Sequence, residues 1–85
     1  MRVAVVILNW NGKLFLEKFL QSALQNSPQA NLYVADNAST DDSLAFVRNH
    51  FPSVKLIDNG KNIGFAGGYN KALSELTEEY FVLLN

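Results

Sequence analysis

The sequence contains no cysteine and a single histidine, His50, among its 85 residues. Disulfides and thiolate metal sites are therefore excluded, and so is a histidine-rich metal centre. An excess of positive charge is also missing, because the net charge is -1. A nucleic-acid partner would usually be marked by a basic excess or patch, so we expect no such partner.

Long hydrophobic runs and targeting segments are absent as well. Residues 3–8 are apolar, but this run is far too short to span a bilayer and polar residues follow it at once. It fits a buried strand better. The expected compartment is the cytosol, and parts of a longer protein could place the chain at the cytoplasmic face of a membrane.

The length and the apolar content indicate one small folded domain. Apolar residues make up 48% of the chain, which is typical of a sequence with a core rather than of a disordered one. A domain of this size buries a lower fraction of its surface than a larger one, so the core should be thin.

The hydrophobic periodicity changes regularly along the chain. Strands are expected at residues 3–8, 32–35, 54–57 and 80–84, where short apolar, partly β-branched runs occur. Apolar residues at helical spacing predict helices over residues 16–24, 39–51 and 69–76. The first helix should close at residues 26–28, and the second should begin with Ser39 as N-cap and stop before Pro52.

This alternation of strands and helices predicts a parallel sheet with right-handed crossovers and helices on its faces. Ligands of such sheets bind beyond the carboxyl ends of the strands. The residues that follow each strand are therefore the candidates for chemistry.

The first strand is followed by Asn9, Trp10 and Asn11. The indole of Trp10 offers a flat face on which a base could stack, a contact that contributes about 1–3 kcal/mol per base in single-strand binders. Trp10 could equally cover the end of the sheet. The residue alone does not separate these two interpretations.

The second strand is followed by Asp36 and Asn37. Asp36 lies about 20 residues beyond the first turn, the spacing at which a carboxylate accepts hydrogen bonds from ribose in dinucleotide-binding folds. The amide of Asn37 can donate and accept, which suits the mixed edge of a pyrimidine. An Asx turn in an ordinary loop explains both residues at least as well when they are taken in isolation.

The third strand leads into a loop at residues 58–68 with four glycines. Backbone N–H groups at the start of the next helix could face phosphate, although a flexible turn is the commoner role of such glycines. The pattern matches neither the P-loop nor the dinucleotide fingerprint. After the fourth strand only Asn85 remains.

The remaining features receive structural interpretations. A solvated helix face and its end are expected at residues 71–79, including Glu78. His50 is interpreted as a residue that caps a helix C-terminus. Four phenylalanines are expected in the core: Phe15, Phe19, Phe46 and Phe81.

Taken together, these segments resemble family 2 glycosyltransferases of the GT-A fold, over essentially the whole chain. Residues 8–12 read L-N-W-N-G, where the family has an aromatic residue and then Asn. Residues 34–41 read V-A-D-N-A-S-T-D, similar to the family's V-D-[DN]-x-S-x-D. Residues 62–70 read N-I-G-F-A-G-G-Y-N, similar to N-x-G-F-[AS]-x-[AG]-x-N, and residues 80–85 look like the strand that enters the D-x-D motif.

The resemblance implies a three-layer α/β/α, Rossmann-like fold with a mostly parallel four-stranded sheet, and a nucleotide-sugar donor. Residues 1–85 would be the N-terminal nucleotide-binding part of a GT-A domain, incomplete at its C-terminus. A divalent metal, Mg²⁺ or Mn²⁺, would bridge the donor diphosphate in the full-length enzyme, but this fragment would not hold it firmly. Asn85 would be the first position of the metal motif. The implied nucleotide-sugar site comprises Asn9, Trp10, Asn11, Asp36, Asn37, Asn62, Gly64, Phe65 and Gly67.

The sequence departs from the family pattern at two points. Many members carry a second acid where this chain has Asn37, and the branch with V-D-N-x-S includes rhamnosyltransferase-like enzymes. The donor is therefore expected to be linked to UDP or dTDP. The catalytic base of the family lies further along the chain, so no residue here can be assigned that role.

The expected function is transfer of a sugar to a saccharide acceptor in cell-surface polysaccharide or glycan synthesis, by an enzyme of which this chain is an inactive part. A nucleotidyltransferase and a non-catalytic nucleotide-binding or interaction module are the alternatives. Surface left open by truncation should favour self-association. Replacement of Asp36 by alanine is expected to weaken nucleotide binding with little effect on folding.

Overall fold

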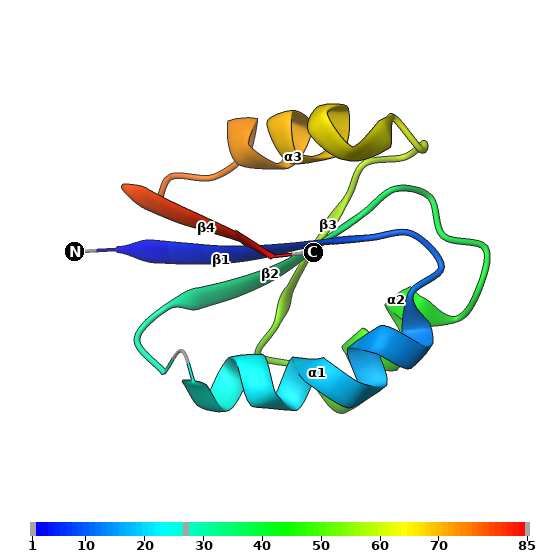
Figure 1. Ribbon diagram of the computed structural model, residues 1–85, viewed down its shortest axis with the longest axis horizontal. Coiled ribbons are helices and arrows are strands. Elements are labelled where there is room, and N and C mark those ends of the chain that lie inside the picture. The colour runs from blue at the N-terminus through cyan, green and yellow to red at the C-terminus, as the bar shows by residue number, and fades with distance from the viewer. Residues whose placement is uncertain (1, 27, 85) are drawn as a thin grey trace.

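The computed structural model describes residues 2–26 and 28–84. Four parallel strands form one sheet in the order β3-β2-β1-β4. The strands are β1 (Val3–Asn9), β2 (Asn31–Asp36), β3 (Lys55–Asp58) and β4 (Tyr80–Leu84). All four point the same way, so their carboxyl ends and the loops that follow lie at one edge, on the right in Figure 1.

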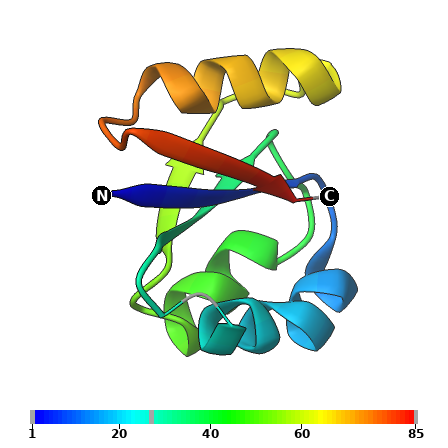
Figure 2. The same ribbon diagram turned by 60° about the vertical axis from the view of Figure 1, so that its left-hand side comes forward.

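Helices cover both faces of the sheet. One face carries α1 (Lys13–Asn26) and α2 (Ser43–His50), and the other carries α3 (Gly64–Ser74), as Figures 1 and 2 show. The three-layer α/β/α arrangement and the parallel sheet predicted from the sequence are confirmed.

Alternate residues of the central strands supply the two halves of the core. Val5 and Val34 face α1 and α2, where Leu16 and Leu20 are almost completely buried. Full burial of a leucine side chain stabilises a fold by about 1.5–3 kcal/mol. The intervening strand residues, among them Val6, face α3. This division explains why the central strands are apolar on both faces.

The third helix begins five residues earlier than the sequence pattern predicts. It starts at Gly64 instead of Tyr69, so the last three glycines of the expected loop are helical. Gly68 permits this, because a Cβ at that position would lie 2.7 Å from Leu8 Cδ1 and 2.9 Å from Asn37 Nδ2. The helix therefore packs directly against the carboxyl end of the sheet.

The expected N-cap of the second helix is wrong. The helix begins at Ser43 after Asp42, and Ser39 is instead bonded to Asp36. The Ser39 hydroxyl donates to the buried Asp36 carboxylate and accepts from Asn9 Nδ2 and Asn11 N, so its oxygen is engaged by residues other than those of the helix start.

The expected burial of the phenylalanines is wrong for three of the four. The exposed fractions are 39% for Phe15, 51% for Phe19 and 40% for Phe81, whereas Phe46 is half-buried and packs on the α1–α2 side of the core. Phe15 and Phe19 pack on each other on α1, with ring centroids 4.7 Å apart, and Phe81 belongs to the edge strand β4.

The expected exposure of Glu78 is also wrong. Its side chain is 8% exposed and lies in the loop before β4. Glu78 Oε2 accepts hydrogen bonds from Tyr33 Oη (2.6 Å) and Asn31 Nδ2 (2.8 Å). These donors hold the pKa of Glu78 below its ordinary value, and burial together with the bond to Glu78 raises the pKa of Tyr33 to about 12. The cluster secures the amino end of the sheet.

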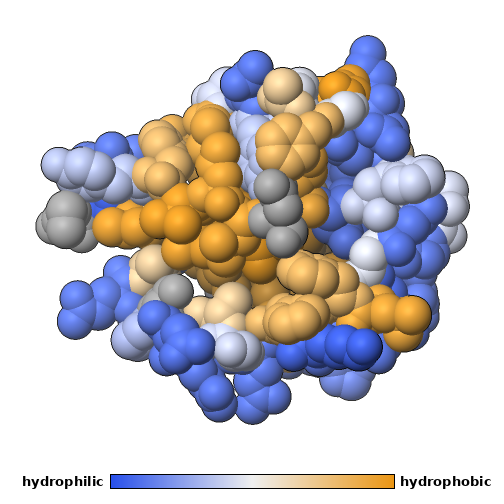
Figure 3. Space-filling view, in the orientation of Figure 1, coloured by the Kyte–Doolittle hydropathy of each residue, from blue (hydrophilic) through white to orange (hydrophobic). Residues whose placement is uncertain are grey.

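The β4 edge forms an apolar surface. Every residue of β4 is exposed, from 38% for Leu84 to 56% for Tyr80. Figure 3 shows this apolar surface in the middle of the view and more hydrophilic residues towards the right. Among the described residues, no helix is long and apolar enough to cross a membrane.

Candidate functional site

The carboxyl ends of the three adjacent strands are in register. Asn9 pairs with Asp36, and Asp36 pairs with Asp58. Two backbone bonds carry this ladder one step further, from Asn37 N to Asn9 O (2.9 Å) and from Asn59 N to Asp36 O (2.8 Å). We use "the rim" for Asn9, Asp36, Asn37 and Asn59 together with the loops that they hold.

Asp36 lies at the centre of the rim and has no exposed surface. Its Oδ1 accepts from Asn9 Nδ2 (2.8 Å) and from Ser39 Oγ (2.6 Å), and its Oδ2 accepts from the backbone N–H of Ser39 (2.9 Å). A buried carboxylate that accepts several hydrogen bonds is well satisfied without any ligand. Asp36 therefore joins the end of β1 to the loop after β2.

The loops after β1 and β2 are tied together by Asn11. Asn11 Oδ1 accepts from the backbone N–H groups of Thr40 (2.7 Å) and Asp41 (3.1 Å), and Asn11 N donates to Ser39 Oγ (2.9 Å). Asn11 has a φ of 52°, a left-handed conformation that asparagine tolerates better than most residues. Trp10 stands between the tethered residues Asn9 and Asn11, so the backbone that carries its ring is held in place.

A chain of side-chain amides connects the loops after β2 and β3. Asn59 Nδ2 donates to Asn37 Oδ1 (2.8 Å), and Asn37 Nδ2 donates to the carbonyl oxygen of Gly64 (3.1 Å) and, over a long 3.5 Å, to Asn62 Oδ1. Asn62 Oδ1 also accepts from Gly64 N (3.0 Å). Gly64 has a φ of 78°, which favours glycine at this start of α3.

The predicted site residues thus meet at one edge of the sheet, in two groups. Asn9, Asp36 and Asn37 are buried beneath the rim, with exposed fractions of 4%, 0% and 2%. Above them, Trp10 and Phe65 are 57% and 60% exposed. Asn11, Asn62 and Gly64 are also exposed, and Gly67 is half-buried in α3.

Charged residues flank the rim on the side of α1 and α2. Lys13 Nζ lies 2.9 Å from Asp42 Oδ2 at the start of the two helices. The hydrogen bond from Lys13 holds the pKa of Asp42 below its ordinary value, and the same bond raises the pKa of Lys13. The pair offsets the charge of Lys13, whereas Lys61, in the loop after β3, is exposed and forms no ion pair among the described residues.

The described residues do not form a metal centre by themselves. Within residues 2–26 and 28–84, no three side chains of His, Cys, Asp or Glu lie together in a way that could hold a metal ion. The oxygens of Asp36 are also taken by internal donors. The expected ligand Asn85 lies outside the described residues.

Two rim residues have roles that the sequence reasoning missed. Asn59 received no function and Ser39 was expected to cap a helix, yet each bridges two loops at the rim. Asn59 directly follows β3, and Asn37 directly follows β2, of which Asp36 is the last residue. The rule that residues after parallel strands share one edge could have identified it.

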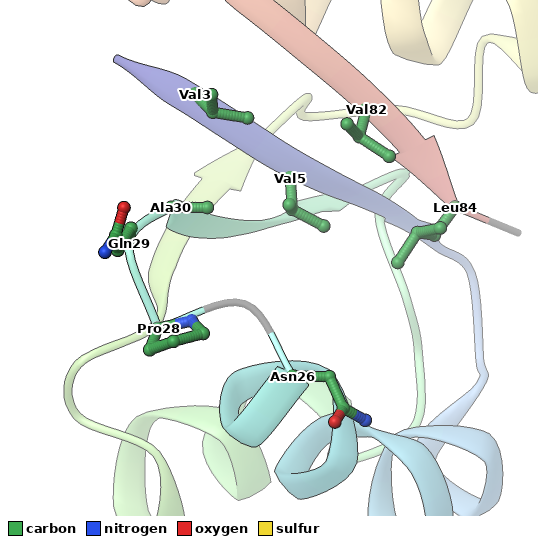
Figure 4. Close-up of a pocket in the computed structure, with 8 residues that line it drawn as sticks. All are labelled: Val3, Val5, Asn26, Pro28, Gln29, Ala30, Val82 and Leu84. Atoms are coloured by element: carbon green, nitrogen blue, oxygen red, sulfur yellow. The ribbon is translucent and has the colours of Figure 1, made fainter. Parts of the chain in front are cut away.

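A groove of about 470 Å³ lies away from the rim. It is lined by the side chains that Figure 4 shows, from β1, β4, the end of α1 and the segment between α1 and β2: Val3, Val5, Asn26, Pro28, Gln29, Ala30, Val82 and Leu84. None of these residues belongs to the predicted site. The groove is mostly apolar.

Comparison with known proteins relates the chain to enzymes that transfer sugars. Residues 4–85 match the family model described as "Glycosyl transferase family 2". N-acetylglucosaminyl-diphospho-decaprenol L-rhamnosyltransferase from two strains of Mycobacterium tuberculosis is 31% identical over 75 residues, which are 87% of this chain and 24% of the relative. A teichoic acid poly(glycerol phosphate) polymerase from Staphylococcus epidermidis is 26% identical over 99% of this chain and 12% of the relative.

Solved structures show the same fold. The mannosyltransferase PcManGT from Pyrobaculum calidifontis, in complex with GDP-Man and Mn²⁺, superposes with a TM-score of 0.78 at 27% identity over 92% of this chain and 25% of that one. S. aureus TarS 1-349 superposes with a TM-score of 0.81 at 22% identity, over 99% of this chain and 27% of that one. The chain therefore spans about a quarter of the rhamnosyltransferase and of these structures.

Proposed function

The chain belongs to glycosyltransferase family 2, and from this premise we propose that its rim binds the nucleoside diphosphate of a sugar donor. One observation supports this more than any other. Motifs that are about 25 residues apart in sequence, around Asp36 and around Asn62, are joined by hydrogen bonds at one edge of a parallel sheet. Ligands of such sheets bind at this edge.

The exposed residues are the proposed ligand contacts. Trp10 offers its indole face to the base, and Asn11 and Asn62 offer amide groups to the nucleoside. The N–H of Gly64 is bonded to Asn62 Oδ1, but the backbone N–H groups that follow it in the first turn of α3 can face the diphosphate, because a helix start favours negative charge. These groups can bind a nucleotide without any change in the core.

Asp36 and Asn37 support the ligand from below. Direct contact between either side chain and a nucleoside would require an internal hydrogen bond to be exchanged for one to the ligand, because both are buried and bonded. Their main effect in this proposal is to hold the loops that carry Trp10 and Asn62.

The donor nucleotide is proposed to be UDP or dTDP. The resemblance of residues 34–41 to the rhamnosyltransferase-like branch supports this proposal, and one relative is an L-rhamnosyltransferase by name. PcManGT was solved with GDP-Man, so GDP is the competing nucleotide.

A divalent cation, Mg²⁺ or Mn²⁺, is proposed to accompany the diphosphate. PcManGT was solved with Mn²⁺, and a hard cation bound to phosphate oxygens neutralises charge as the nucleoside diphosphate leaves. Asn85 is the proposed first position of the metal motif. No catalytic step is assigned to the residues of this chain.

For the whole enzyme we propose sugar transfer to a saccharide acceptor in cell-surface polysaccharide or glycan synthesis, in the cytoplasm or at the cytoplasmic face of a membrane. The names of the rhamnosyltransferase and the teichoic acid polymerase support the polysaccharide context. The chain spans about a quarter of the rhamnosyltransferase, and we assign neither an acceptor site nor a catalytic base to its residues.

Titration calorimetry of the chain with UDP, dTDP, GDP and NAD, each with and without Mn²⁺, tests the binding proposal. We expect UDP or dTDP to bind and NAD not to bind. Trp10→Ala should raise the Kd by about tenfold, since base–aromatic stacking contributes about 1–3 kcal/mol. Phe19→Ala is the matched control, because Phe19 is a similarly exposed aromatic on α1. Equal losses in both variants would reject Trp10 as the stacking platform.

We also propose that β4 pairs with a second copy of this chain. As an edge strand it presents unpaired backbone groups, its side chains are apolar and exposed, and a net charge of -1 repels a second copy only weakly. Sedimentation of the chain should show a concentration-dependent dimer. Val82→Lys should shift the chain to monomer, and a monomeric wild type would refute the pairing.

A further inference from the structure

We infer that Asn59 is a positioning residue, which fixes the orientation of the Asn37 amide and thereby the start of α3. Asn59 directly follows β3 and is 4% exposed. Its backbone N–H continues the sheet ladder to Asp36 O, so its side chain projects from a backbone that is itself held in place.

The orientation of the Asn59 amide is determined by its partners. Its Nδ2 donates to Asn37 Oδ1 (2.8 Å) and to the carbonyl oxygen of Gly68 (3.3 Å). Both partners are acceptors, so the reverse orientation would place an oxygen against two oxygens. Asn59 Oδ1 is buried and has no hydrogen-bond partner among the described residues.

Asn37 receives its direction from Asn59. With its oxygen turned to Asn59, its Nδ2 must point to the Gly64 carbonyl oxygen and to Asn62 Oδ1. Asn62 Oδ1 in turn remains available for the N–H of Gly64. The direction of one buried amide is thus transmitted through a second amide to the loop proposed to face the nucleotide.

α3 packs closely against the Asn37 side chain at Gly68. A Cβ on Gly68 would lie 2.9 Å from Asn37 Nδ2 and 3.0 Å from Asn37 Oδ1. A residue larger than glycine at position 68 would therefore clash with the Asn37 amide, and the close packing of α3 on that amide depends on Gly68.

This relay explains why an amide suits position 37 in this chain. An aspartate there would accept from Asn59 but would direct its second oxygen at the Gly64 carbonyl oxygen and at Asn62 Oδ1, both acceptors. Asn37 and Asn59 therefore act as a pair. The inference rests on the proposed function only for its effect on nucleotide affinity.

Asn59→Asp tests the relay, because it keeps the shape of the side chain and removes the donor. We expect the backbone amide hydrogen of Gly64 to exchange with solvent about fivefold faster or more. About fivefold is the factor that corresponds to losing one hydrogen bond with a typical net contribution of about 1 kcal/mol. The amides of the β1–β2 ladder should keep their protection, which a general loss of fold would not allow. Asn49→Asp makes the same chemical change at an exposed position on α2 and should leave the exchange of Gly64 unchanged.

The effect on binding is measured on the same variants by titration with UDP and dTDP. The Kd should rise by about fivefold or more in Asn59→Asp and stay unchanged in Asn49→Asp. If Asn59→Asp does not fold, Asn59→Ala removes the donor without adding a charge and replaces it in both measurements. Unchanged exchange at Gly64 in a folded variant would overturn the inference. Faster exchange with unchanged affinity would overturn the role in binding. If the wild type bound neither nucleotide, the proposed function would fail, and the exchange result would still decide the role of Asn59.

Discussion

Replacement of Asp36 by alanine should cost the fold much of its stability, contrary to what its position in a loop suggests from the sequence. The side chain has no exposed surface and accepts three hydrogen bonds, from Asn9 Nδ2, Ser39 Oγ and Ser39 N. A hydrogen bond to a charged group contributes about 1.5–3 kcal/mol, and a buried donor left unpaired costs about 1–3 kcal/mol. Because such terms are not additive, we expect a total loss of roughly 3–5 kcal/mol.

That loss is large for a chain of this size. Typical stabilities of about 0.05–0.15 kcal/mol per residue correspond to roughly 4–13 kcal/mol here. Asp36→Asn should cost less, about 1–3 kcal/mol, because its amide keeps the shape and one acceptor oxygen but places N–H groups against one of the three donors.

Urea denaturation of the wild type and the variants measures these differences. Asp58→Ala is the matched control, because Asp58 pairs with Asp36 in the sheet register but is exposed. Among the described residues its side chain accepts a single hydrogen bond, from the N–H of Gly60 (2.8 Å). Its loss should stay at about 1 kcal/mol or below. The reasoning is refuted if Asp36→Ala is as stable as Asp58→Ala. In that case the Asp36 bonds would contribute nothing net to folding.

Three further predictions concern other parts of the molecule. The hydrogen bond from Tyr33 is the main cause that holds the pKa of Glu78 below its ordinary value of 4.5, so the ionised carboxylate stabilises the fold fully above about pH 4.5 and this stabilisation is lost as the pH falls through the lowered pKa. Glu78→Gln should therefore make the free energy of unfolding depend less on pH in the acid range, and an unchanged dependence would contradict this. Ala38 has a φ of 59°, a conformation that costs an L-residue about 1–2 kcal/mol, whereas glycine at this position would stabilise the unfolded chain by about 0.4–1 kcal/mol through its greater entropy. Ala38→Gly should therefore raise the free energy of unfolding, measured by urea titration, by up to about 1 kcal/mol, and a decrease would argue against strain at Ala38. Trp10→Ala should leave that free energy within about 0.5 kcal/mol of wild type, as for most exposed positions, and a larger loss would show that the indole covers the sheet end.

The layers of the fold could be predicted because they depend on local patterns. Apolar runs such as Val3 to Leu8 and helical spacing such as that of Leu16 and Leu20 are properties of short segments, and the alternation of the two predicts a parallel sheet. The convergence of the residues after the strands also followed, because parallel strands end at one edge. The start of α3 could not be predicted, since it depends on whether Gly68 meets open space or the side chains of Leu8 and Asn37.

The choice of partner for each polar group required the tertiary structure. Asp36 and Asn9 are 27 residues apart, and only the strand register brings Asn9 Nδ2 within 2.8 Å of the carboxylate. From sequence, Asp36 was a loop residue and Glu78 a surface residue. In the folded protein other segments pack over both side chains, and both become buried hydrogen-bond acceptors.

The sequence by itself determined where strands and helices occur, that the sheet is parallel, and which motifs gather at its edge, because these follow from periodicity and chain direction. Tertiary structure alone decided which of the gathered residues face solvent and which support them from below. Trp10 and Asp36 illustrate the difference, with 57% and 0% of their surface exposed although both stand at strand ends. Hydrogen bonds across distant segments select one arrangement of the rim, and no local pattern encodes that selection.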